Sequence, residues 1–183
     1  MLPLSVLDVI KVRGSIRKYK DKPIPKSDLL KILEAARLAQ SAANRQAWQF
    51  IVITDKKTRE KLMDVAHWPD SPPQNHVGQA AAVIVCLGDP KACRPVGPFE
   101  GYLIDLPIAI ENMALTAWEL GVGSCWIGAY QEDKVKSLLG VPESLRVVSL
   151  FLLGYQDEDP RPKVRKSLEE IIHYEKYGQK QPA

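Results

Sequence analysis

Apolar residues recur at helical spacing early in the chain and again in its middle. Between Leu29 and Ala39 they fall at every third or fourth position, which predicts a helix that starts after the N-cap Ser27 and ends near 38–41. A second helix is predicted over 105–121, with Asp105 as its cap; it is apolar nearly all round, which indicates burial, often at an interface. Shorter helices are expected over 5–12, 57–66, 132–139 and 168–172.

Three other segments are rich in the β-branched and aromatic residues of strands. WQFIVIT at 48–54 and RVVSLFLLGY at 146–155 each predict one strand. The continuous apolar run AAVIVCLG at 81–88 predicts a strand that is buried on both faces. Helices and strands alternate irregularly, so we expect a single α+β domain over 1–183, with a sheet covered by helices.

Proline-rich segments separate these elements. WPDSPP at 68–73 is predicted to be a loop, because proline removes a backbone donor and fixes φ. Residues 89–104 hold Pro90, Pro95 and Pro98 and are predicted to cross the surface irregularly. After 155 the chain becomes charged, which predicts a C-terminal extension over 156–183.

Composition and charge exclude several classes of protein. The chain has 183 residues, of which 45% are hydrophobic, enough for one domain with a core. A net charge of +3 is far from the basic excess of a nucleic-acid-binding protein. We expect no membrane span, because no apolar run reaches about 18 residues. Three cysteines without C-x-x-C spacing and scattered histidines predict a cytoplasmic protein with reduced thiols and no metal site.

The densest basic cluster lies near the N-terminus. Arg13 and Arg17 flank Gly14 and Ser15. Guanidinium groups and a hydroxyl suit phosphate oxygens, and glycine lets the backbone approach an anion. The alternative is a solvated basic face, which is what most charge runs are.

A second basic cluster lies near the C-terminus, where Arg161, Lys163, Arg165 and Lys166 alternate with prolines. In an extended segment Lys163 and Arg165 point the same way. The two clusters could therefore converge on one dianion, although their spacing does not require it.

Two further segments could touch a ligand. In SAANRQAW at 41–48, Asn44 and Gln46 have donors and acceptors for an amide-like edge; an ordinary loop is the alternative. GVGSCWIGAY at 121–130 lacks G-x-G-x-x-G and follows a helix, which argues against a dinucleotide-binding fold. Cys125 could act as a nucleophile, but no histidine is near in sequence and a buried filler role is favoured.

Taken together, three segments resemble the FMN-dependent nitroreductase family of the NAD(P)H:flavin oxidoreductase superfamily. They are RGSIRKYKDKPIPKSDLLKILEAARLAQSAANRQAWQFIVI, ENMALTAWELGVGSCWIG and LLGYQDEDPRPKVRKSLEEIIHYEKYG, in the family's order. The resemblance implies a central, mostly antiparallel sheet flanked by helices. It also implies an intertwined homodimer with two FMN molecules at the subunit interface, and the apolar helix with Trp118 would suit a dimer core.

The same resemblance implies roles for individual residues. The phosphate would be held by Arg13, Gly14, Ser15 and Arg17, with Lys163 and Arg165 completing the site. The loop residues Ser41, Ala42, Asn44 and Gln46 would reach the flavin from the other subunit. Backbone at Trp126, Ile127 and Gly128 would lie beside the flavin ring. By contrast, Lys18, Lys20 and Lys22 are expected to be solvated charges.

The implied activity is ping-pong hydride transfer. NADH or NADPH would reduce the flavin at N5, and a nitroaromatic, quinone or enone would then take the hydride in the same pocket. The 67–102 segment, with Trp68, Phe99 and Tyr102, is expected to cover that pocket; plain loop packing is equally compatible with its aromatic residues. Alternatives are a specialised relative, such as a reductive dehalogenase, a flavin-fragmenting enzyme or a ring dehydrogenase, and a non-catalytic flavin-binding or redox-sensing module.

Overall fold

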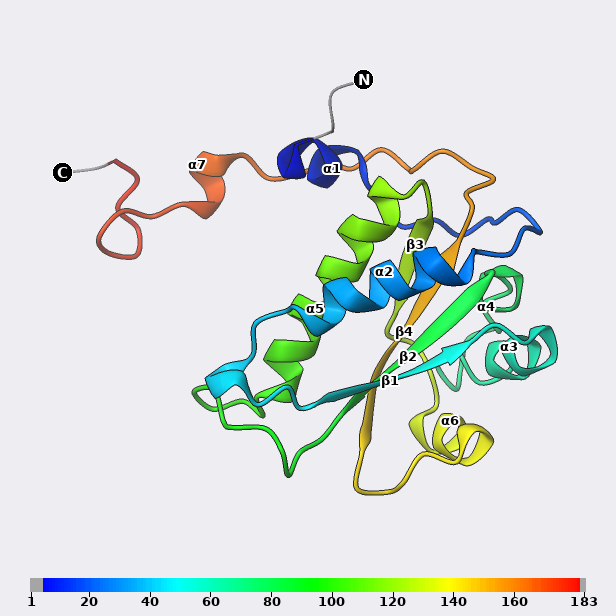
Figure 1. Ribbon diagram of the computed structural model, residues 1–183. Helices are drawn as coiled ribbons and strands as arrows, with labels where there is room; N and C mark the ends of the chain where they lie inside the picture. The colour runs from blue at the N-terminus through cyan, green and yellow to red at the C-terminus, as the bar shows by residue number, and fades with distance from the viewer. Residues whose placement is uncertain (1–4, 182–183) are drawn as a thin grey trace.

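Four strands form one antiparallel sheet in the order β1-β2-β4-β3 (Figure 1). The computed structural model describes residues 5–181, so the ends of the predicted domain, 1–4 and 182–183, lie outside the described residues. The strands are β1 (Trp48–Ile53), β2 (Ala82–Gly88), β3 (Gly123–Ile127) and β4 (Arg146–Gly154). The α+β prediction and three of these strands are confirmed.

Helices cover both faces of the sheet. On one face α2 (Lys26–Arg37) and α5 (Tyr102–Glu119) enclose a core with Ile84 and Phe151. On the other face α3 (Lys56–Met63), α4 (His76–Gln79) and α6 (Glu132–Leu139) enclose a second core with Val85 and Leu152. Alternate residues of β2 therefore enter different cores, which confirms its predicted burial on both faces.

The strand β3 was not predicted, and it is the edge of the sheet next to β4. Its segment contains Gly123 and follows closely on Gly121, and glycine is depleted in strands, so local composition gave no strand signal. Gly123 is required by packing, because a Cβ there would lie 2.7 Å from Ile16 Cγ1. The strand is thus specified by its neighbours rather than by its own propensity.

Both predicted helix caps were wrong. The helix α2 begins at Lys26, with Pro25 at its N-cap position, because the φ of −56° fixed by proline already suits a helix start. The helix α5 begins at Tyr102, three residues before the predicted cap Asp105. The Asp105 carboxylate is buried and instead accepts a hydrogen bond from the backbone N–H of Ala42, at 3.0 Å.

The two ends of the chain lie on the same side of the molecule. The helix α1 (Val6–Val12) starts with a capping box of Ser5 and Asp8. After β4 the chain passes close to α1, and the short helix α7 (Leu168–Ile171) lies away from the body (Figure 1). No helix among the described residues is both long enough and apolar enough to cross a membrane.

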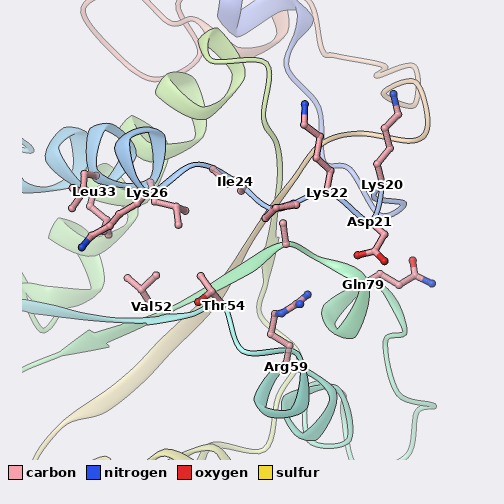
Figure 2. A pocket seen from close by; sticks show the side chains of 14 residues that line it. Lys20, Asp21, Lys22, Ile24, Lys26, Leu33, Val52, Thr54, Arg59 and Gln79 are labelled. Carbon is pink, nitrogen blue, oxygen red and sulfur yellow. The ribbon is translucent and has the colours of Figure 1, made fainter.

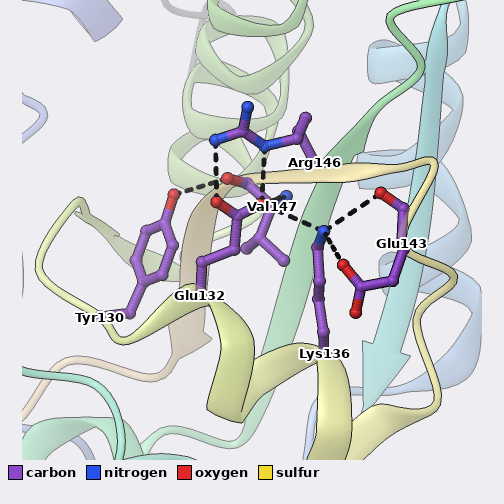
Figure 3. Close-up of polar contacts among 6 residues, drawn as sticks. All are labelled: Tyr130, Glu132, Lys136, Glu143, Arg146 and Val147. Atoms are coloured by element: carbon purple, nitrogen blue, oxygen red, sulfur yellow. Dashed lines mark hydrogen bonds and ion pairs between the residues drawn. The ribbon is translucent and has the colours of Figure 1, made fainter.

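A polar cluster attaches α6 to β4 (Figure 3). The Glu132 carboxylate accepts two hydrogen bonds from Arg146, both at 3.0 Å, and one from the Val147 N–H at 2.9 Å. The Lys136 side chain is only 6% exposed, and its Nζ lies 3.8 Å from Glu132 and 3.3 Å from Glu143. The Tyr130 hydroxyl donates to the Val147 carbonyl at 2.7 Å. These bonds fix the segment that follows β3.

Candidate functional site

Residues 13–17 lie in an extended segment beside the first half of β3. The Ile16 N–H donates to the Ser124 carbonyl at 2.9 Å, and Ser15 forms an isolated bridge with Ser124. Ile16 is completely buried, so the segment is anchored through its own side chain. The neighbouring Ser15 and Arg17 are thereby held at fixed positions along the edge of the sheet.

The C-terminal extension runs beside this segment and is bonded to it. The Lys20 N–H donates to the Tyr155 carbonyl at 2.8 Å, and the Asp157 N–H donates to the Lys18 carbonyl at 2.9 Å. Further along, a Cβ on Gly14 would lie 2.5 Å from Pro160 Cβ. Gly14 is therefore needed for close packing against the extension, a reason that the sequence alone did not suggest.

These contacts bring the two basic clusters together. One cleft is lined by residues of both segments: Ser15, Arg17, Arg161, Pro162, Lys163 and Arg165. Two carboxylates lie nearby, and both are engaged: Glu158 accepts from the Arg17 N–H at 2.5 Å, and Glu111 pairs with Arg13 at 2.9 Å. The lining contains four cationic residues (Arg17, Arg161, Lys163 and Arg165) and no acidic residue, so the cleft is positively charged.

The electrostatics of the cleft show how closely the cations are packed. The pKa of Lys163 is lowered, mainly by burial and then by the charges of Arg13 and Arg165. Arg13 Nε is buried, and no hydrogen-bond partner for it occurs among the described residues. The pKa of His76 at the start of α4 is also lowered, by burial and by the charge of Arg17. An anion placed in this cleft would meet the cationic side chains of Arg17, Arg161, Lys163 and Arg165.

A second cleft adjoins the first at Ser15 and extends towards Trp126. It is lined by Arg13, Gly14 and Ser15, by Ile110, Glu111 and Ala114 of α5, by Phe151 of β4, and by Ser124, Cys125 and Trp126 of β3. The Trp126 side chain is exposed, Ile127 is buried, and the space beside Gly128 is open. Three of the four predicted cofactor-binding segments therefore meet along the edge of β3.

Cys125 is not suited to nucleophilic catalysis. It is buried, and burial raises the pKa of its thiol more than Arg17 and a hydrogen bond with Ser15 lower it. A neutral, buried thiol is a poor nucleophile. The expectation that Cys125 fills the core is in accord with this environment.

The fourth predicted segment, 41–46, lies away from both clefts, at the N-terminal end of α5. In Figure 1 its 3-10 helix η1 (Ala42–Asn44) is at the lower left, whereas residues 13–17 lie on the opposite side of the molecule. The side chains of Asn44 and Gln46 are exposed. Ser41 lies in the same loop, and its hydroxyl accepts from the Gln46 N–H at 3.0 Å.

The backbone of this loop is strained. Ala43, Asn44 and Gln46 have φ of 50°, 54° and 50°, in the left-handed region that non-glycine residues rarely adopt. Such strain persists where the surroundings enforce it and is concentrated at ligand-binding sites. The buried acid Asp105 supplies part of that enforcement, because its carboxylate holds the Ala42 N–H. The sequence signal for it was an acidic residue directly before the apolar run 106–110.

The predicted 67–102 cover consists of two separate loops, because α4 and β2 lie between them. In the first loop the Gln74 side chain donates to the Ala129 carbonyl at 3.3 Å, and His67 Nε2 lies 3.3 Å from Gln131 Nε2. Trp68 is 59% exposed and follows His67 directly. Tyr102 was expected to face a ligand, but it is buried because its ring packs on Gly88.

A groove larger than both clefts lies elsewhere, between α2, the 20–26 segment, β1 and α3 (Figure 2). Its volume is about 620 Å³, and none of the predicted cofactor-binding residues lines it. Lys20 and Lys22 lie at its edge. Lys18, Lys20 and Lys22 are exposed, as expected of solvated charges. Two of them also make surface contacts: Lys22 Nζ lies 4.1 Å from the Tyr155 ring centre, and Lys18 Nζ lies 3.7 Å from Asp157.

Comparison with known proteins gives consistent results. The family model described as Nitroreductase family matches residues 10–155. A protein of Archaeoglobus fulgidus named NADH dehydrogenase/NAD(P)H nitroreductase is 39% identical over 157 residues, which are 84% of this chain and 86% of that protein. A Staphylococcus aureus protein named NADPH-dependent oxidoreductase is 28% identical, over 94% of this chain and 74% of that one.

Solved structures show the same fold. A nitroreductase family protein from Clostridium novyi is 33% identical with a TM-score of 0.78, and the match covers 97% of both chains. An FMN-dependent nitroreductase from Clostridium difficile is 29% identical with a TM-score of 0.80, over 93% of this chain and 99% of that one.

Proposed function

Because the chain belongs to the nitroreductase family, we propose that it is an FMN-dependent NAD(P)H oxidoreductase that acts as a homodimer. The main support is the meeting of the two basic clusters in a cleft that continues towards Trp126. FMN has a phosphate with nearly two negative charges at one end and a flat ring at the other. The two adjoining clefts match this division. The first cleft is lined by cationic residues, and the second reaches Trp126 of β3.

The residues of the cationic cleft fit a phosphate. Arg13, which lines the adjoining cleft, has a buried donor without a partner among the described residues, and Lys163 has a lowered pKa because desolvation and neighbouring cations disfavour its charge. A dianion would satisfy the donor and stabilise the charged lysine. We expect the phosphate to be held by Arg13, Gly14, Ser15, Arg17, Lys163 and Arg165.

The ring would lie along the end of β3, beside the backbone of Trp126, Ile127 and Gly128. The open space at Gly128 permits close approach of a flat group to the main chain. Because the loop with Ser41, Ala42, Asn44 and Gln46 lies away from these clefts in one chain, we assign its contact with the ring to a second subunit.

Exposed apolar residues favour that second subunit. The helix α1 exposes Val6, Leu7, Ile10 and Val12, and the first turn of α5 exposes Leu103 and Ile104. Exposed apolar patches of this kind mark association surfaces. The predicted dimer-core residue Trp118 is partly buried, and it packs against the core of its own chain.

Hydride transfer in this proposal requires no catalytic side chain. FMN, when bound, would supply hydride transfer through N5 from NADH or NADPH to the acceptor. The chain holds the phosphate, orients the ring through the β3 backbone and shapes the acceptor pocket. A pocket over a flat ring suits flat acceptors, so we propose nitroaromatics, quinones and enones.

The test begins with the purified protein. We expect a yellow solution with a flavin spectrum, a dimer in sedimentation, and anaerobic bleaching by NADH or NADPH. Adding each acceptor class to the bleached protein should restore the colour. A colourless protein that takes up no added FMN would contradict the proposal, and one that binds FMN without being bleached would be a passive flavin binder.

A further inference from the structure

The C-terminal extension runs antiparallel to the segment that contains Arg17. Tyr19 forms an antiparallel bridge with Gln156, and backbone hydrogen bonds lie on both sides of that bridge. Two residues further along the extension, the Glu158 carboxylate accepts a hydrogen bond from the Arg17 N–H at 2.5 Å. The side chain of Glu158 therefore continues the attachment of the extension towards the cationic cleft.

The bond between Glu158 and Arg17 is the last one before the cationic stretch 161–165. Among the described residues, no hydrogen bond joins this stretch to 13–17. Pro160, just before the stretch, lacks a backbone N–H and contributes packing. The position of the cationic stretch therefore depends closely on the bond that Glu158 makes.

The cationic residues of the two segments repel one another. The cleft is lined by Arg17, Arg161, Lys163 and Arg165 and by no acidic residue. The pKa of Lys163 is lowered, mainly by burial and then by the charges of Arg13 and Arg165. Like charges at close range disfavour each other, so the stretch is pushed away from Arg17 unless an anion neutralises it. A fixed attachment beside the cleft is therefore needed to hold its two sides together.

Glu158 can affect an anion in this cleft in two opposite ways. Its negative charge lies next to the Arg17 backbone and would repel an anion. Its hydrogen bond holds the extension in place, and a bond from an N–H to a carboxylate is stronger than a neutral one. A substitution that removes both should therefore strengthen anion binding if the charge dominates, and weaken it if the attachment dominates.

We propose that Glu158 is a positioning residue of the phosphate site: its bond to the Arg17 N–H keeps Lys163 and Arg165 next to Ser15. This inference rests on the proposed function, in which the cleft holds the FMN phosphate. Glu158 itself does not line the cleft, so it acts through the two segments that it joins. An acidic residue thereby strengthens the binding of an anion, because the attachment outweighs the repulsion.

Two flavins that differ only in the phosphate test this role. The apoproteins are titrated with FMN and with riboflavin, which has the same ring and ribityl chain but no phosphate, and each Kd is read from flavin fluorescence. Glu158→Ala should raise the Kd for FMN by about tenfold, the size of one lost hydrogen bond to a charged group. The Kd for riboflavin should be unchanged, because riboflavin has no phosphate to place in the cleft.

Two matched variants separate the bond from the charge. Glu158→Gln removes the charge but keeps an oxygen acceptor, so its Kd for FMN should be no higher than that of the wild type. Asp159→Ala removes the charge of the neighbouring exposed acid and should not raise that Kd either. In the apoprotein, amide exchange at Arg17 should be faster in Glu158→Ala, whereas exchange at Ile16, whose N–H is bonded to Ser124, should be unchanged.

The outcomes separate this role from the proposed function. A Kd for FMN that stays the same or falls in Glu158→Ala overturns the positioning role while the proposed function stands. So does an equal rise for riboflavin, an equal rise in either matched variant, or unchanged exchange at Arg17. A wild type that binds FMN no more tightly than riboflavin overturns the phosphate site, and this inference with it. A wild type that binds neither flavin contradicts the proposed function itself and the role that rests on it.

Discussion

Arg13 has a buried hydrogen-bond donor that favours the binding of an anion. Its side chain is 30% exposed and paired with Glu111, while its Nε is buried without a partner among the described residues. An unpaired buried donor costs about 1–3 kcal/mol. A phosphate oxygen bonded to Nε would remove that cost, which would add to the binding energy.

We therefore expect Arg13→Ala to weaken FMN binding by about 10–100-fold, equal to about 1.5–3 kcal/mol for a hydrogen bond to a charged group. Lys22→Ala is the matched control: it removes the same charge from the same segment, but Lys22 lies over Tyr155. Its effect should be less than about threefold. Titration of each apoprotein with FMN, followed by flavin fluorescence, checks both; equal affinities would remove Arg13 from the site.

Asp105 is the second residue whose replacement should have a specific effect. Its Oδ1 holds the Ala42 N–H, whereas Oδ2 is buried without a partner in the described part of the chain. Asp105→Ala should lower the free energy of unfolding by about 1–3 kcal/mol and speed amide exchange at Ala42, because that N–H loses its acceptor.

Asp105→Asn keeps the oxygen acceptor and is the control. Its free energy of unfolding in urea should stay within about 1 kcal/mol of the wild type. If exchange at Ala42 is equally slow in Asp105→Ala, the carboxylate does not hold the loop.

At the scale of elements, the contact between α6 and β4 depends on one carboxylate. Burial raises the pKa of Glu132, but hydrogen bonds from Arg146 and Val147 and the nearby cations outweigh burial, so the net shift is downward. A carboxyl with a lowered folded pKa stabilises the fold above its unfolded pKa, and this contribution is lost as pH falls through the folded pKa. The contact should therefore weaken in acid.

Glu132→Gln should accordingly lower the free energy of unfolding by about 1–3 kcal/mol near neutral pH. The difference from the wild type should shrink as pH falls below the ordinary glutamate pKa of 4.5. Urea denaturation across that range checks the sign. Glu119→Gln, a substitution at the exposed end of α5, is the control and should show neither effect.

Periodicity predicted most elements but not their exact starts. The two-face burial of 81–88 and the apolar stripe from Leu29 follow directly from sequence spacing. The start of α5 was not predicted correctly, because aspartate is a common N-cap residue and the group that Asp105 binds, the Ala42 N–H, is distant in sequence. The strand β3 was missed because pairing with β4, and packing of Ile16 on Gly123, outweigh a low local propensity.

At the scale of the whole molecule, the candidate site joins the two ends of the chain. The sequence supplied the residue types, and the family resemblance supplied the expectation that they meet. Neither could show which contacts hold the two segments together. These are backbone hydrogen bonds between 18–20 and 155–157 and the packing of Pro160 against Gly14. The separation of the 41–46 loop from both clefts likewise appears only when all elements are assembled.

The site should therefore depend on the C-terminal extension as much as on Arg13. Lys163→Ala with Arg165→Ala should weaken FMN binding by about 100-fold or more and should reduce its dependence on salt, because two charges leave the phosphate site. Lys176→Ala with Lys180→Ala removes equal charge from the exposed tail. Affinity titrations at several salt concentrations should show no change in that control; an equal loss in both variants would indicate a general charge effect.

The same joining of the chain ends has a consequence for synthesis of the protein. Arg13 and Arg17 are synthesised well before Lys163 and Arg165, which follow all four strands of the sheet in the sequence. A domain begins to fold while it is synthesised, at about 5–20 residues per second. The sheet can thus begin to assemble before a complete phosphate site exists, and cofactor uptake should follow assembly of the sheet.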